Sequence, residues 1–177
     1  MMMTVTQEAP TIRPVIKSEI SELCQLRLEA LQNEPEAFSR DYATDRNNSP
    51  AAWEKWLGQR SDGTSGIIFV ACADDQLAGM MGIARGCTAK TLHSGFIWGV
   101  YVRPGYRRQG LARQLMEACI EWAHERGVEI VKLGVTNTNV AAIRFYAACG
   151  FHVYGIEPKA LWYNDRYYDE LLMVREI

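Results

Sequence analysis

The sequence has few of the residues and patterns that mark metal sites, disulfide frameworks or membrane spans. Its five cysteines are widely scattered without a Cys-x-x-Cys pair, and the three histidines do not stand near them at the spacing of metal ligands. We therefore expect reduced thiols in a cytoplasmic protein, and no bound metal. No apolar run approaches the roughly 18 residues that span a bilayer, so no membrane partner is expected.

An excess of either charge is also missing. The 177 residues carry 19 lysines and arginines against 21 aspartates and glutamates, a net charge of −2. A nucleic-acid-binding domain usually carries a basic surface, so no nucleic-acid partner is expected. Residues 1–10 lack a basic segment followed by an apolar core, so they do not resemble a secretory signal, and we expect a disordered leader there.

The patterns that are present predict one domain over residues 11–177, built from strands and helices. Strands are expected at 12–16, 67–73, 77–85, 96–102, 130–135, 151–154 and 166–174. Helices are expected from a Ser18 cap to a stop at Asn33-Glu34-Pro35, and at 50–60, 110–126 and 139–149, with a loop at 38–48. The early strands pair by hairpins, and a right-handed crossover joins a later parallel pair. The expected fold class is α/β, close to α+β, with a mixed, mostly antiparallel sheet.

The turn between strand 96–102 and the next helix is the most informative segment. It reads Arg107-Arg108-Gln109-Gly110-Leu111-Ala112. A helix N-terminus has free backbone N–H groups and a partial positive charge, so it can hold an anion. Gly110 removes a side chain where the backbone would approach that anion. The segment predicts a cofactor whose phosphates lie at the turn and whose other end lies along the strand.

A second segment carries a matching pattern. Residues 137–151 read Asn-Thr-Asn-Val-Ala-Ala-Ile-Arg-Phe-Tyr-Ala-Ala-Cys-Gly-Phe. The first segment resembles the Q/R-x-x-G-x-G/A coenzyme A signature of the GNAT superfamily of N-acetyltransferases, with Ala112 in place of the more frequent glycine. The second resembles that family's N-x-x-A-x-x-F-Y-x-x-x-G-F motif. Two motifs in this order, with a strand between them, are a specific signal, and the resemblance spans residues 11–177.

The resemblance implies a fold and a co-substrate. The GNAT fold has a twisted, mostly antiparallel sheet of six to seven strands with a splayed parallel pair, flanked by about four helices. In that family the pantetheine arm of acetyl-CoA fills the splay. The residues implied to bind acetyl-CoA are Val100, Tyr101, Val102, Arg107, Arg108, Gln109, Gly110, Leu111, Ala112 and Asn139. Gly99, inside the strand, independently indicates a bulge or a close backbone approach.

Asn139 and Tyr146 lie seven positions apart, about two helical turns, and so share a helix face. Asn139 is expected to bond the pantetheine arm or simply to cap its helix. Tyr146 is expected to act as the general acid that protonates the coenzyme A thiolate, which is easier if the site lowers its pKa. A half-buried core tyrosine is the alternative.

The resemblance further implies direct transfer of the acetyl group to a primary amine in a ternary complex, without a cysteine or a metal. We expect a small amine as acceptor, with a protein amine left open, and a homodimer by resemblance alone. Candidates for the general base are weak, and none is chosen among Glu29, Glu34, His93 and Tyr101. Aromatic residues expected near the acceptor are Phe38, Tyr42, Trp53, Trp56, Trp162, Tyr163 and Tyr167.

Two other functions fit the residues less well than acetyl transfer. A non-catalytic acyl-CoA-binding module would keep the fold without turnover, and the presence of Tyr146 argues against it. A phosphate-binding P-loop would need a Gly-Lys-Ser/Thr ending that the turn lacks.

Overall fold

Seven strands form a single sheet in the computed structural model, which describes residues 9–177. The strands are β1 (Thr11–Pro14), β2 (Gly66–Ala73), β3 (Gln76–Arg85), β4 (Ser94–Val102), β5 (Ile130–Thr136), β6 (His152–Tyr163) and β7 (Arg166–Glu176). The helices are α1 (Ile20–Asn33), α2 (Tyr42–Asp45), α3 (Pro50–Arg60), α4 (Leu111–Glu125) and α5 (Val140–Ala148). Strand order is β1-β2-β3-β4-β5-β7-β6, with β4 and β5 parallel and every other pair antiparallel. The predicted mixed, mostly antiparallel sheet is confirmed.

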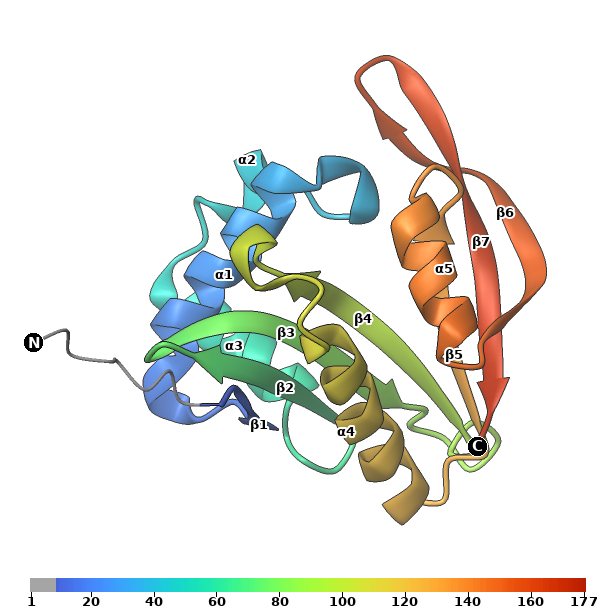
Figure 1. The fold of residues 1–177 in the computed structure, drawn as a ribbon, viewed down its shortest axis with the longest axis horizontal. Helices are drawn as coiled ribbons and strands as arrows, with labels where there is room; N and C mark the ends of the chain where they lie inside the picture. The colour runs from blue at the N-terminus through green and yellow to red at the C-terminus, as the bar shows by residue number, and fades with distance from the viewer. Residues whose placement is uncertain (1–8) are drawn as a thin grey trace, which may run out of the picture.

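Helices cover both faces of this sheet (Figure 1). The amphipathic helix α4 packs its buried stripe on β2, β3 and β4, and α5 joins the same layer through Tyr146 and Cys149. The opposite face is covered by α1, whose Leu23, Leu26 and Ala30 pack against β2 and β3. The sheet therefore separates two apolar cores. An opening between its strands is reached from both cores, by side chains under α4 and α5 on one face and under α1 on the other.

Such an opening lies between the parallel strands. β4 and β5 pair only where Ser94–Phe96 of β4 lies beside Ile130–Lys132 of β5. Figure 1 shows the first four strands on one side and α5, β6 and β7 on the other, diverging from the end where β4 and β5 still pair. The separation confirms the expected splayed pair.

Gly99 supports this divergence with a bulge in β4. Its φ is +64°, and the β3–β4 register shifts so that Gly99 and Val100 together face Met81. A bulge bends its strand and increases the local twist. The bulge predicted from a glycine inside a strand is thus confirmed.

Three local expectations need correction. Ser18 does not cap α1, because a 3-10 turn over Lys17–Glu19 precedes the helix and the Glu19 carboxylate accepts from the Ile16 N–H (3.1 Å). The expected loop at 38–48 contains α2, because Asp41 caps it by accepting from the Thr44 N–H (2.7 Å).

The third correction concerns the sixth strand, which runs to Tyr163 rather than ending at residue 154. Register shifts after Val153 and after Glu157 break the alternation that identifies a strand in sequence. The hairpin tip predicted at Asn164 and Asp165 is confirmed, with φ values of 48° and 55°.

Of the expected leader, residues 1–8 lie outside the described residues. Within residues 9–177, no helix combines the length and the hydropathy needed to cross a membrane.

Replacing Gly99 with alanine should destabilise the fold, because a side chain at positive φ is strained. The expected loss in the free energy of unfolding is about 1–2 kcal/mol, measured by urea denaturation. Gly58 lies in α3 with no atom within 4 Å of an added Cβ, so the control Gly58→Ala should be neutral or stabilising by up to about 1 kcal/mol. Equal stability of the Gly99→Ala variant and the unmutated chain would contradict the bulge argument.

Candidate functional site

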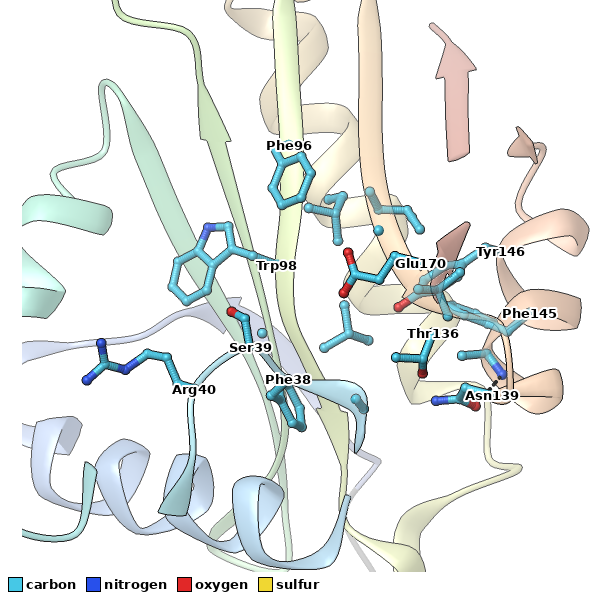
Figure 2. Close-up of a pocket in the computed structure, with 18 of the residues that line it drawn as sticks. Phe38, Ser39, Arg40, Phe96, Trp98, Thr136, Asn139, Phe145, Tyr146 and Glu170 are labelled. Atoms are coloured by element: carbon cyan, nitrogen blue, oxygen red, sulfur yellow. Dashed lines mark hydrogen bonds between the residues drawn. The ribbon is translucent and has the colours of Figure 1, made fainter. Parts of the chain in front are cut away.

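A pocket of about 380 Å³ occupies the opening between β4 and β5 (Figure 2). Both strands, α5, the segment 37–40 and β7 contribute to its wall. The lining residues central to its chemistry are Phe38, Arg40, Phe96, Trp98, Val100, Gly134, Thr136, Asn139, Tyr146 and Glu170. Unpaired edges of two strands therefore meet side chains from far apart in the sequence.

The two faces of the sheet bring different groups to this pocket. Ile97, Leu133 and Val135 belong to the core under α4 and α5, together with Tyr146. Because side chains alternate along a strand, the intervening residues of β4 and β5 point to the opposite face, under α1 and the segment 37–40. That second face carries aromatic rings from β4 and, on β5, Gly134 and Thr136.

Tyr146 reaches the pocket from the α5 side. Its side chain is 6% exposed and packs against Phe145 and Phe151, with ring centroids 5.3 and 6.2 Å away. Burial raises the pKa of Tyr146 above the ordinary value of a phenol. The condition considered from the sequence, a lowered pKa, is therefore wrong in direction. The hydroxyl therefore stays protonated at neutral pH.

Asn139 caps α5 and also lines the pocket. Its Oδ1 accepts from the Ala142 N–H (3.1 Å). Figure 2 shows its amide nitrogen turned away from the helix, toward the opening. The two roles considered for Asn139 are thus compatible, with the oxygen holding the helix and the nitrogen left to donate.

The predicted anion-binding turn lies at the start of α4. Gly110 is the N-cap residue, at φ +83°, and no side chain caps the helix. Arg108 also has a left-handed backbone, at φ +62°. Successive N–H groups in such a turn form a concave anion site at the positive end of the helix dipole. Leu111 is buried and anchors the turn.

The side chains of this turn differ in their hydrogen-bond partners. Arg107 donates from Nε to the Val102 carbonyl (2.9 Å) and pairs with Glu34 (2.8 Å), so its guanidinium lies toward the end of α1. Gln109 donates to the Gly105 carbonyl (3.2 Å). Arg108, the second arginine of the turn, has its side chain exposed to solvent.

The strand residues named from sequence also differ in what they offer. The Val100 side chain lines the pocket. Tyr101 is buried toward α1, where its hydroxyl donates to Glu29 (3.0 Å) and accepts from Asn33 (3.0 Å). Val102 packs into the core under α4. For Val102, only the backbone is available to a ligand in the opening, whereas the Tyr101 backbone pairs with Met80 of β3.

None of the acidic groups or the histidine considered as a base lines this pocket. Glu29 is bound by Arg103 (2.9 Å) as well as by Tyr101, while Glu34 is bound by Arg107. His93 lies in a separate hollow beside the start of β4.

Glu170 is the carboxylate that sequence reasoning missed. It lies on β7 opposite Thr136 of β5 and Glu157 of β6. Figure 2 shows its carboxylate directed into the space between β4 and β5. Burial, and then the Glu157 carboxylate, raise the pKa of Glu170. The one available signal was an acidic residue on the strand expected at 166–174.

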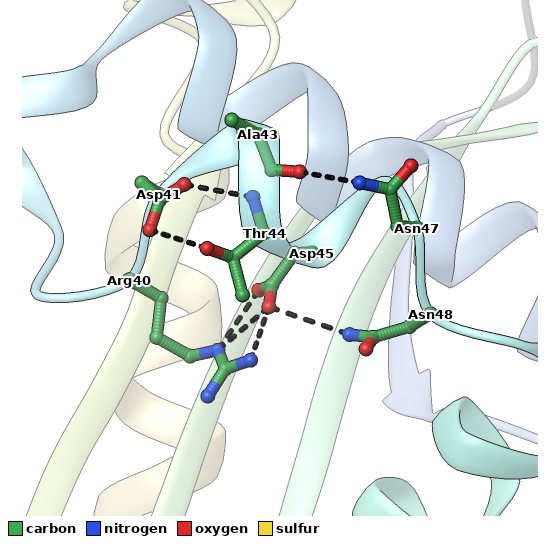
Figure 3. A network of polar contacts seen from close by, with 7 residues as sticks. All are labelled: Arg40, Asp41, Ala43, Thr44, Asp45, Asn47 and Asn48. Atoms are coloured by element: carbon green, nitrogen blue, oxygen red, sulfur yellow. Dashed lines mark hydrogen bonds and ion pairs between the residues drawn. The ribbon is translucent and has the colours of Figure 1, made fainter.

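Residues 36–40 form a segment over the pocket, called the cover below, and a polar network fixes it (Figure 3). Asp45 is 1% exposed, and its carboxylate binds Arg40 through Nε (2.8 Å) and a second guanidinium nitrogen. Phe38, in the same segment, lies 4.6 Å from the Arg27 guanidinium carbon. Tyr168 of β7 donates to Glu36 (2.9 Å), the first residue of the cover. The cover is therefore bound to both α1 and β7.

Only some of the expected aromatic residues line the pocket. Trp56 and Trp98 meet edge to face, 5.3 Å apart, and Phe38 and Phe96 complete the aromatic wall. Trp53 is core, and Trp162 packs on Tyr167 at the exposed end of the last hairpin. Within residues 9–177, no group of three or more histidines, cysteines, aspartates or glutamates is close enough to hold a metal ion.

Known proteins resemble this chain in sequence and in fold. An uncharacterized N-acetyltransferase of Archaeoglobus fulgidus is 29% identical over 140 residues, 77% of this chain and 89% of that protein. The ribosomal protein bS18-alanine N-acetyltransferase of Salmonella typhimurium is 31% identical over 114 residues, 58% of this chain and 74% of that protein. A Salmonella typhimurium structure solved with its cofactor acetyl-CoA has a TM-score of 0.82 at 21% identity, covering 96% of this chain and 94% of that one.

The sequence model of the acetyltransferase (GNAT) family matches residues 24–151, which include both motifs and the strands that form the opening. The chain therefore belongs to the GNAT family of acetyltransferases and is an acyltransferase, as the two motifs predicted.

Proposed function

We propose that the chain transfers the acetyl group of acetyl-CoA directly to a primary amine held in the pocket between β4 and β5. The observation that carries the proposal is the opening itself, which joins a helix N-terminus, an unpaired strand edge and a buried phenol. An acyl thioester supplies an activated acetyl group when it is bound there. Family membership supports the same activity.

The residues present fit this co-substrate. Backbone N–H groups of residues 108–112 would bind the pyrophosphate at the start of α4. Beyond Phe96, β4 has no pairing with β5, so the β5-facing backbone N–H groups of Val100 and Val102 are left for the pantetheine arm. The Tyr101 backbone pairs with Met80 of β3, and the Val102 carbonyl accepts from Arg107. Asn139 would donate to the same arm from α5.

Tyr146 would act as the general acid toward the sulfur. A phenol with a raised pKa is a weak acid in water, but the same surroundings disfavour a thiolate. Burial raises the pKa of the neighbouring Cys149 thiol as well. Desolvation thus makes a thiolate in this pocket a stronger base. The pKa of the thiol therefore moves closer to the raised pKa of the Tyr146 phenol, which makes the proton transfer easier.

Removing the Tyr146 hydroxyl should slow turnover without weakening co-substrate binding. We expect Tyr146→Phe to lose about 100-fold or more in kcat, the usual contribution of a general acid. Release of free thiol from acetyl-CoA measures turnover, and equilibrium binding of acetyl-CoA measures affinity. Tyr106→Phe, which removes a hydroxyl bonded to Asp74, is the matched control. Unchanged turnover in Tyr146→Phe would contradict the acid role.

Adding a methyl group at Gly110 should weaken acetyl-CoA binding, because φ is +83° there and the backbone must approach the phosphates. We expect Gly110→Ala to raise KM for acetyl-CoA about tenfold or more, the cost of one charge-assisted hydrogen bond. Gly105→Ala, at a position with no atom within 4 Å of the new Cβ, is the control. Equal KM values for the two variants would place the phosphates elsewhere.

We propose a small amine as the acceptor. The aromatic wall and the segment 37–40 support it, because they enclose the second face of the pocket. A protein N-terminal amine is the second candidate, favoured by the named activity of the Salmonella relative. A screen of small amines and of peptides with an N-terminal alanine, read by thiol release, separates them. Tight acetyl-CoA binding without turnover on any amine would overturn the transferase proposal.

We also propose that the protein is a cytoplasmic homodimer. All five cysteines are free thiols, which suits a reducing compartment. The last hairpin exposes large apolar side chains, among them Ile156 at 62% and Trp162 at 57%, and such patches mark association surfaces.

Light scattering after gel filtration should therefore give twice the chain mass of 20.0 kDa. The double variant Ile156→Glu and Trp162→Glu should give a monomer. A monomeric unmutated chain would contradict the dimer.

A further inference from the structure

We propose that Glu170 is the base that takes the proton from the acceptor ammonium, that Gly134 and Glu157 tune it, and that the acceptor carries its amine on an apolar or aromatic body. This inference rests on the proposed acetyl transfer. It adds to that function the group that makes the acceptor nucleophilic and the chemical class of the acceptor.

Glu170 has the right place in the sheet. On β7, Leu171 and Met173 pack in the core under α4 and α5, so alternation turns Glu170 and Tyr168 to the other face. Tyr168 confirms that direction by donating to Glu36, which lies in the cover. Tyr146 enters the opening from the α5 face, and Glu170 enters it from the face beneath the cover. A donor and an acceptor of protons therefore flank the same gap.

Gly134 gives the carboxylate its position. A Cβ added at residue 134 would lie 2.5 Å from Oε2 of Glu170 and 3.3 Å from its Cδ. The carboxylate therefore rests directly on the β5 backbone, in space that any other residue would fill. Because the clash would be with the end of a flexible side chain, an alanine there displaces the carboxylate while the strand pairing stays.

The charged groups around Glu170 leave it a usable base. On β6, Glu157 is its cross-strand neighbour, and repulsion from that carboxylate adds to the effect of burial in raising the pKa of Glu170. Next to the carboxylate β5 presents the uncharged Gly134 and Thr136, and α5 presents Asn139 and Tyr146. Lys132 lies on the same face of β5, two residues before Gly134, and lines the separate hollow beside the start of β4. In the cover, the Arg40 guanidinium is bound by Asp45. Arg27 of α1 also lines the pocket, stacked on Phe38.

The aromatic residues of the pocket wall indicate which kind of acceptor molecule carries the amine. Phe38, Phe96, Trp56 and Trp98 line the same pocket as Glu170. Aromatic rings attract cations at their faces and bury apolar groups. A primary ammonium on an apolar or aromatic body satisfies both the carboxylate and these rings.

The proton balance closes with these two groups. The acceptor arrives as an ammonium, and Glu170 takes one proton and later releases it to water. The amine lone pair forms the new C–N bond as the C–S bond breaks. Tyr146 gives its proton to the departing sulfur and recovers one from the nitrogen. The products are the amide, the free thiol and one proton in solution.

The test uses phenethylamine as the acceptor probe and ethylamine as the matched amine without an aromatic body. We expect phenethylamine to have at least a tenfold higher kcat/KM with the unmutated enzyme. Glu170→Gln should lower kcat/KM for phenethylamine about 100-fold while acetyl-CoA binding is retained. Glu121→Gln, at an exposed position of α4, controls for loss of a negative charge.

The pH profile distinguishes a base from a structural residue. With the unmutated enzyme, activity should fall in acid as Glu170 becomes protonated. Glu170→Gln should lose this acidic limb, and Glu157→Gln should move it to lower pH because the repulsion is gone. Gly134→Ala should lower activity, with the fold and acetyl-CoA binding kept.

Stability provides an independent readout. A raised carboxyl pKa means that the folded state holds a proton that the unfolded state has lost, so Glu170 opposes folding increasingly as pH rises through the interval between the two pKa values. Glu170→Gln should therefore be at least as stable as the unmutated chain at neutral pH. A less stable variant would indicate a structural role and overturn the inference.

The outcomes for this inference and for the proposed function are distinct. An unmutated enzyme that turns over no amine overturns acetyl transfer, and the inference with it. An active enzyme whose Glu170→Gln variant keeps both its rate and its acidic limb overturns the base alone. Equal preference for ethylamine and phenethylamine overturns the acceptor class.

Discussion

The early separation of β4 from β5 is the constraint on which the rest of the site depends. Sheet strands normally continue pairing because an unpaired backbone N–H or C=O away from water loses free energy. Here pairing ends at Phe96 and Lys132, and the Gly99 bulge bends β4 along the part that has no β5 partner. The unpaired edges therefore take their hydrogen-bond partners from outside the sheet, either water or a bound molecule.

The opening also joins two surroundings that the sheet otherwise separates. The α5 face contributes a buried phenol, and the face beneath the cover contributes a half-buried carboxylate. Desolvation shifts both groups in the same direction, toward their protonated forms. For the phenol this preserves a donor, whereas for the carboxylate it produces a stronger base. One physical cause therefore favours the opposite roles proposed for these two groups.

The sequence identified the features whose logic is local. Gly110 at a helix start and Asn139 with Tyr146 on one helix face follow from spacing along a single element, so their placement was predictable. Glu170 was not, because its position depends on the β5–β7 and β6–β7 registers, which bring residues 134, 157 and 170 together. The folded cover was missed for a similar reason. Its Arg40–Asp45 ion pair depends on the burial of Asp45, which the sequence does not show.

The bond between Tyr168 and Glu36 has a consequence for the order of folding. It joins residues 132 positions apart in the chain, and contacts of such separation form after local ones because they close a long loop. The cover, which precedes α2, lacks its bond to Tyr168 until β7 has taken its place between β5 and β6. Enclosure of the pocket by the cover is therefore a late step of folding, after the local contacts of α1 and α2 have formed.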